Sequence, residues 1–172
     1  GDREAREDLQ HAGGDVVSAP IETDLAEKTV TALKELAALV GFKVYANWCD
    51  RNGRQPFDEN GRNEYRVVDV NVKPRRYESF TSSVATVEIL LDGRIGFSSR
   101  VIDGWPADAY LEIVGLLEEW HGSIAAAKRA LGTEFFAPVG MRLDGGGDFY
   151  IDRESNAVRF SIPFTVRGRV RR

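Results

Sequence analysis

The alternation of apolar and polar residues is most regular near the end of the chain, over residues 157–170. One parity is apolar and comprises Val158, Phe160, Ile162, Phe164 and Val166. The other parity is polar and cationic and comprises Arg159, Ser161, Pro163, Thr165, Arg167 and Arg169. Because successive side chains of a strand point to opposite faces, this pattern predicts a long strand with one apolar and one polar wall. Pro163 has no N–H to donate to a strand ladder, which predicts a sheet edge or a bulge there.

A helical period replaces this alternation over residues 24–40. Asp24 and Glu27 have the spacing of a capping box, and Gly41 is placed to end the helix. The apolar positions recur three and four residues apart and comprise Ala26, Val30, Leu33, Leu36, Ala37 and Val40. Such a stripe predicts a helix that covers a sheet.

A second helical period begins at Pro106, a residue that is tolerated in the first turn of a helix. The expected inward residues are Tyr110, Ile113, Val114, Leu117 and Trp120. Gly122 breaks this helix, and Ser123 then caps a short further helix that Gly132 ends.

The remaining apolar segments have the length and composition of strands. We expect strands over residues 42–48, 64–72, 83–91, 135–143 and 149–151. Tight turns are predicted at Asn52-Gly53 and Asn60-Gly61, and Asp92-Gly93 predicts a hairpin before residues 94–98. Runs of strands joined by short turns favour an α+β fold with a mainly antiparallel sheet, covered by two main helices and ending in a long C-terminal β-hairpin. Residues 1–20 are expected to form a charged arm, and residues 21–172 a single α+β domain.

Composition narrows the class of protein. The chain has 172 residues and a net charge of −4, which gives no support for a mainly electrostatic nucleic-acid binder. Its single cysteine, Cys49, allows no intrachain disulfide, and no apolar run approaches the roughly 20 residues of a membrane span. Basic residues gather at the C-terminus: Arg167, Arg169, Arg171 and Arg172.

No motif predicts a catalytic, cofactor-binding or metal-binding residue. His11, His121 and Cys49 are too scattered for a metal site of recognisable spacing. The glycines 145–147 precede a strand rather than a helix, so a hairpin loop is favoured over a phosphate-binding loop. A metal-dependent nuclease would use Asp69 and Glu88 on neighbouring strands, but a partner lysine two residues after Glu88 is replaced by Leu90.

Three stretches resemble the tail terminator (tail completion, or neck) family of tailed bacteriophages. They are V-A-T-V-E-I-L-L-D-G-R-I at residues 84–95, the helix P-A-D-A-Y-L-E-I-V-G-L-L-E-E-W, and the ending F-S-I-P-F-T-V-R-G-R-V. The resemblance covers about residues 22–170. It implies a non-enzymatic virion structural protein at the tail–head junction, assembled in the host cytoplasm. It also implies a hexameric ring that caps the tail tube protein and joins it to the head–tail connector protein. The charged arm and the loop over residues 52–63 depart from the compact family pattern.

The residues themselves are consistent with a closed homo-oligomer, because an edge strand that pairs between neighbours is no longer exposed. We expect five arginines to contact acidic surfaces of a neighbour, or packaged DNA in passing through its phosphates. They are Arg159, Arg167, Arg169, Arg171 and Arg172. A small α+β domain that binds a ligand or peptide, without membrane contact, is the alternative from another class.

Overall fold

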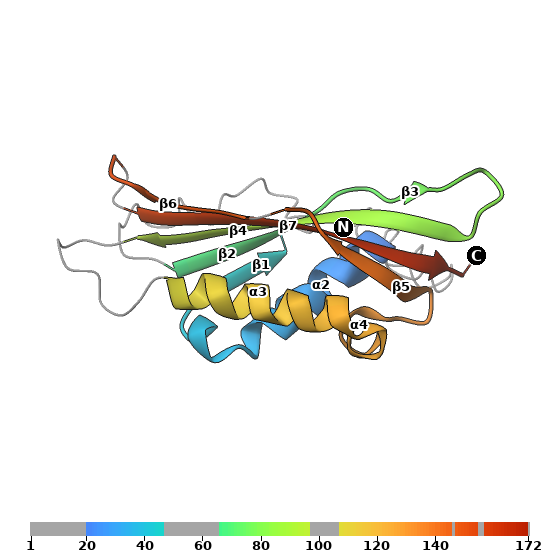
Figure 1. Ribbon diagram of the computed structural model, residues 1–172, viewed down its shortest axis with the longest axis horizontal. Coiled ribbons are helices and arrows are strands. Elements are labelled where there is room, and N and C mark those ends of the chain that lie inside the picture. Colours follow the sequence, from blue (N-terminus) through green and yellow to red (C-terminus); the bar gives the residue numbers. More distant parts are fainter. Residues whose placement is uncertain (1–19, 47–65, 97–106, 146, 155–156, 172) are drawn as a thin grey trace, which may run out of the picture.

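Two long antiparallel strands form the spine of the molecule. The computed structural model describes residues 20–46, 66–96, 107–145, 147–154 and 157–171. In it β4 (Val84–Gly96) pairs with β7 (Ala157–Val170) from Val84 opposite Arg169 to Gly96 opposite Ala157. At about 3.3 Å per residue, this ladder separates its two ends by about 40 Å. The spine therefore defines the long axis of the molecule (Figure 1).

Each spine strand is flanked by two shorter strands. Along β4 lie β2 (Arg66–Val72) and β3 (Arg76–Tyr77), and along β7 lie β6 (Asp148–Asp152) and β5 (Phe136–Leu143). β1 (Lys43–Ala46) adds to β2 in parallel. The described strands thus form a seven-stranded sheet that is antiparallel except for the β1–β2 pair.

The helices cover one face of this sheet. They are α2 (Ile21–Lys34), the 3₁₀ turn η1 (Ala37–Leu39), α3 (Ala107–Gly122) and α4 (Ile124–Leu131). Figure 1 shows α2, α3 and α4 on the same side of the strands. The predicted α+β class is confirmed, with α4 as a third helix beside the two main ones.

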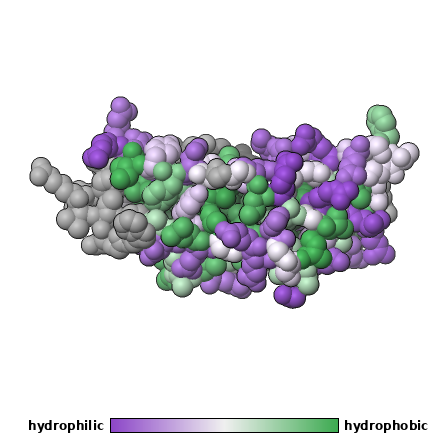
Figure 2. All heavy atoms as spheres, in the orientation of Figure 1, coloured by the Kyte–Doolittle hydropathy of each residue, from purple (hydrophilic) through white to green (hydrophobic). Residues whose placement is uncertain are grey.

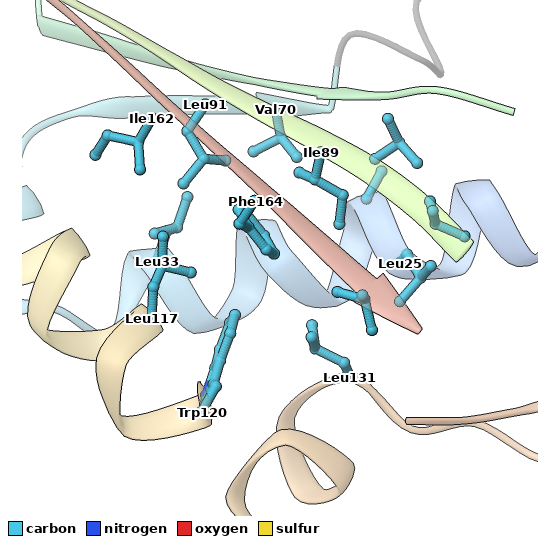
Figure 3. Close-up of a cluster of buried hydrophobic side chains, with 14 of the residues drawn as sticks. Leu25, Leu33, Val70, Ile89, Leu91, Leu117, Trp120, Leu131, Ile162 and Phe164 are labelled. Carbon is cyan, nitrogen blue, oxygen red and sulfur yellow. The ribbon is translucent and has the colours of Figure 1, made fainter. Parts of the chain in front are cut away.

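The core lies between the helices and the apolar wall of the spine. Phe164 is fully buried on β7, and its ring lies 6.4 Å from that of Trp120 on α3. Leu117 of α3 and Leu25 and Leu33 of α2 approach the same layer (Figure 3). The predicted parity of β7 is confirmed: Val158, Phe160, Ile162, Phe164 and Val166 are all buried.

The hairpin predicted at Asp92-Gly93 is wrong, because β4 continues without a turn to Gly96. Gly93 lies opposite Phe160, and a Cβ on Gly93 would overlap the Phe160 ring. The glycine therefore makes room for an aromatic ring on the neighbouring strand. Gly168 on β7 makes the same room for the ring of Phe136 on β5.

The first helix differs from its prediction at both ends. It begins at Ile21, after Pro20, without a side-chain cap, so Asp24 does not cap it. It ends at Lys34, and Val40 is exposed after η1. The helical spacing of the apolar residues predicts a helix to Val40, but α2 ends at Lys34 and the chain continues through η1 to β1.

Pro163 is not at a sheet edge, because β7 is paired on both sides. Its carbonyl accepts a hydrogen bond from the N–H of Asp144 at 3.3 Å, on the β5 side. The paired segment of β6 ends at Ser161, and that of β5 begins at Phe164. The missing N–H of Pro163 thus faces the junction between two flanking strands, so no ladder bond to β4 is lost.

Several other predictions are confirmed. Val68, Val70 and Val72 share the buried face of β2. The hydroxyl of Ser123 accepts a hydrogen bond from the N–H of Ala126 at 3.2 Å, as an N-cap of α4.

Residues 1–19, both Asn-Gly turns and the 52–63 loop lie outside the described residues. No helix in the described ranges is long and apolar enough to cross a membrane.

Candidate assembly surface

The sheet face opposite the helices, here called the open face, carries the polar wall of β7. Its side chains alternate with the core residues, and Arg167 and Arg169 are exposed on it. The same wall contains Thr165, which is buried. None of the described helices packs on this face, and Val67 and Asp69 of β2 are nevertheless buried on it, so only its outer part is exposed.

Three residues of the open face form a hydrogen-bonded group where β5 meets β7. The Thr165 hydroxyl donates to Asp144 Oδ2 at 2.5 Å, and Arg142 Nε donates to Asp144 Oδ1 at 2.6 Å. Burial acts to raise the pKa of Asp144, but these two donors together hold it below its ordinary value. The carboxylate therefore fixes the end of β5 against β7.

Further along the face, cations from the β2–β3 segment meet Glu88 of β4. Lys73 Nζ lies 3.3 Å and Arg76 Nη2 lies 2.8 Å from the Glu88 carboxylate. Arg167 Nε donates to Glu78 Oε1 at 2.5 Å, and this hydrogen bond lowers the pKa of Glu78. These pairs are exposed, so they arrange the surface more than they stabilise the fold.

The predicted contact arginines have different environments. Arg159 is half-buried and pairs with Asp152 of β6 at 3.1 Å. Arg167 pairs with Glu78, while Arg169 and Arg171 are exposed at the end of β7. Arg172 lies outside the described residues. The structure thus groups Arg167, Arg169 and Arg171 at one end of the molecule and places Arg159 toward the other.

The carboxylates of the nuclease alternative do not come together. Asp69 lies opposite Asp92 on β4, whereas Glu88 lies four residues further along that strand, about 13 Å away at 3.3 Å per residue. Glu88 is instead engaged by Lys73 and Arg76. Within the described ranges, no group of three or more His, Cys, Asp or Glu side chains could hold a metal ion. Cys49 and His11 lie outside those ranges.

A shallow hollow of about 510 Å³ lies between α2 and the segment that joins α4 to β5. Its lining is mostly charged or hydroxylated and comprises Asp24, Glu27, Lys28, Thr31, Thr133, Glu134 and Phe135. Burial and the nearby Glu27 carboxylate raise the pKa of Asp24. The hollow is open to solvent, unlike the clefts that bury most of a bound small molecule.

Exposed apolar residues form a feature that the sequence reasoning missed. Phe80, in the connection from β3 to β4, is fully exposed at 101%. Phe149, Tyr150 and Ile151 are consecutive in β6 and all exposed. The available signals were an isolated aromatic in the polar run E-S-F-T-S-S and three apolar residues in a row where alternation was expected.

Comparisons with known proteins bear on the fold. No protein-family model matches the sequence, and no curated protein matches it either. Among solved structures, the chain is similar to a chain of the "Virion of native gene transfer agent (GTA) particle". The TM-score is 0.51 with 16% sequence identity, over 88% of this chain and 99% of that chain. At 16% identity this similarity shows a shared fold, which extends over nearly the whole of the virion chain.

Proposed function

We propose that this chain is a virion structural protein without enzymatic activity, of the tail-terminator type. In this role it closes the tail tube as a homo-oligomeric ring, of six copies on the family resemblance, and joins it to the head–tail connector at the tail–head junction. The observation that carries the proposal is the fold shared with a virion chain over 99% of that chain's length. The sequence stretches at residues 84–95 and in the final strand support the finer assignment.

The arrangement of layers supports an assembly role. The helices bury one face of the sheet, and the exposed part of the open face carries cations and carboxylates in pairs. Exposed charged groups contribute little to the stability of a monomer but give orientation and specificity to a contact with another protein. We propose that Arg167, Arg169 and Arg171 contact a neighbouring subunit or the tube, with passing contact to DNA phosphates.

The same geometry supports a non-catalytic role. Glu88 is engaged by Lys73 and Arg76, and Asp144 by Arg142 and Thr165, in two separate groups on the open face. General acid–base or metal-assisted catalysis instead needs such groups to converge on a shared substrate position.

A small ligand- or peptide-binding domain is the second candidate, and the hollow beside α2 is the observation that favours it. The two functions predict different behaviour. A ring protein self-associates, alone or on a tail tube, whereas a binding domain remains monomeric in both settings.

The test uses purified chain, with and without tail tubes that lack their terminal protein. Negative-stain images and mass photometry should show rings at one end of each tube, and tubes so capped should stop growing. Raising the salt concentration should weaken assembly, because exposed charges are screened over about 8 Å at physiological ionic strength. A wild-type chain that stays monomeric and leaves tube ends bare would overturn the proposal.

A pair of charge reversals sharpens this test. Arg167→Glu with Arg169→Glu should shift the ring toward monomer without unfolding the chain. Lys128→Glu with Arg129→Glu on α4 is the matched control, since it reverses two exposed cations on the helix side. Equal loss of assembly in both variants would mean that net charge, and not the position of the arginines, governs the effect.

A further inference from the structure

We propose that copies of this chain associate head to tail, with the β3–β4 tip of one copy seated on β6 of the next. The β3–β4 tip is defined as residues 78–83, and the β6 surface as the exposed apolar residues Phe149, Tyr150 and Ile151. This inference rests on the proposed ring and names the two surfaces that would build it.

The two surfaces lie at opposite ends of the spine. β3 pairs with β4 near Ala85, and the tip leads into Val84, which lies opposite Arg169. β6 pairs with the other end of β7, from Ala157 to Ser161. Figure 2 shows hydrophobic residues at both ends of the long axis, over β6 on the left and beyond β3 on the right. One copy cannot bring them together, because the paired spine holds them about 40 Å apart.

Each surface exposes large apolar side chains to solvent. Phe80 is fully exposed, and Tyr150 and Ile151 are about half exposed. β6 pairs with β7 alone among the described strands, so its outer edge also offers main-chain hydrogen-bonding groups. Phe149 contacts Tyr110 of α3 edge-on at 5.5 Å, so Phe149 and Ile151 lie on the helix side of β6 and Tyr150 lies on the open face.

Charge argues that the occupant of β6 is another copy of this chain. The β6 end carries Asp148, Asp152 and Glu154 against Arg153 and Arg159, and Arg159 pairs with Asp152. The tip end carries four arginines against two carboxylates: Arg76, Arg167, Arg169 and Arg171 against Glu78 and Glu88, which pair with Arg167 and Arg76. An acidic apolar end therefore faces a basic apolar end when copies are placed head to tail. Such a contact uses two different patches, so it closes into a ring when the rotation between copies allows.

The experiment is a mixing assay by mass photometry and sedimentation velocity, with tail tubes added where the wild type needs them to assemble. The tip variant carries Phe80→Ser with Arg169→Glu and Arg171→Glu. The β6 variant carries Tyr150→Ser and Ile151→Ser, which spare Phe149. Val40→Ser, an exposed apolar residue on the helix side that is 75% accessible, is the matched control. Circular dichroism and melting establish that each variant folds.

Each end variant alone should weaken self-association by at least about 10–100-fold, the effect of removing one large apolar side chain from a contact. Mixed together, the two should form a one-to-one dimer and no larger species, because each supplies the surface that the other lacks. A charge-reversed pair, Asp148→Lys with Glu154→Lys against Arg169→Glu with Arg171→Glu, should associate only when mixed. This arm keeps every apolar residue, so it tests the contact even where the β6 variant is unstable.

The possible results distinguish a failure of this inference from a failure of the proposed ring. A wild type that assembles while both end variants assemble equally well overturns this inference and leaves the ring standing. A mixture that forms no dimer also overturns it, because a symmetric contact between identical patches would behave in that way. A wild type that stays monomeric, even on tail tubes, overturns the ring and the inference together.

Discussion

Gly93→Ala tests the interpretation that this glycine makes room for the Phe160 ring. A Cβ at position 93 would lie well inside contact distance of three Phe160 ring atoms. The ring is 2% exposed and packs edge-on against Tyr110 with centroids 5.9 Å apart, so it has little space into which to move. Overpacking of this kind costs about 1–3 kcal/mol, and we expect Gly93→Ala to lower the free energy of unfolding by that amount.

The control is the same substitution in a Phe160→Ala background. Phe160→Ala alone should cost about 3–5 kcal/mol, as large aromatic truncations in cores do. Without the ring, alanine at 93 meets no clash, and a glycine in a strand interior costs about 0.5–1 kcal/mol relative to alanine. Gly93→Ala should therefore be neutral or stabilising in this background, which makes the two substitutions strongly non-additive.

Equilibrium unfolding in urea measures all four proteins, with the midpoint and slope fitted separately. A coupling energy of at least about 1 kcal/mol supports the interpretation. If Gly93→Ala costs the same with and without the Phe160 ring, the glycine serves backbone conformation, as in the hairpin first predicted, and the reasoning is refuted.

Three further changes probe other parts of the fold. Burial acts to raise the pKa of Glu22, but the hydrogen bonds and charge of Arg75, at 2.7 to 2.9 Å, together hold it below its ordinary value of 4.5. Because the pKa of Glu22 is lower in the folded chain than in the unfolded chain, its ionised carboxylate stabilises the fold above about pH 4.5. This stability is lost as the pH falls through the folded pKa. Glu22→Gln should therefore cost about 1–3 kcal/mol near neutral pH in urea melts and flatten the acid limb; an unchanged limb would contradict this. Ser123→Ala should cost about 0.5–2 kcal/mol by removing the cap bond to Ala126, with Ser123→Asp as the variant that restores it. Phe164→Ala should cost about 3–5 kcal/mol, and a loss well below 1 kcal/mol in denaturant melts would mean that the inward face of β7 is wrongly assigned.

The correctly predicted features are those that depend on the pattern of apolar residues within a single helix or strand. The parity of β7 and the buried faces of β2 and α3 follow from which side of an element meets the core, and that periodicity is written in the local sequence. The cap at Ser123 is also local, since donor and acceptor are three residues apart.

The features missed depend on segments distant in sequence. Asp92-Gly93 has the composition of a hairpin turn, and only Phe160, 67 residues later, makes it a strand interior. The candidate assembly surface also depends on distant segments, because Arg167 pairs with Glu78, which lies 89 residues earlier in the sequence. Residue type identified the arginines as candidates, but their separation into two ends follows from the antiparallel register of β4 and β7.

The position of Pro163 changes which strand can serve assembly. A proline in a long strand suggested that the last strand was an edge open to a neighbour, but β7 is paired along both sides, so no copy can add a strand to it. The association proposed above therefore uses a different element, and β6 pairs with β7 alone among the described strands. That edge bears Tyr150 and Ile151, while Phe80 lies beyond the other end of the spine. Because a paired ladder of thirteen residues cannot fold back on itself, the two end surfaces of one copy cannot contact each other, and the proposed contact joins two copies.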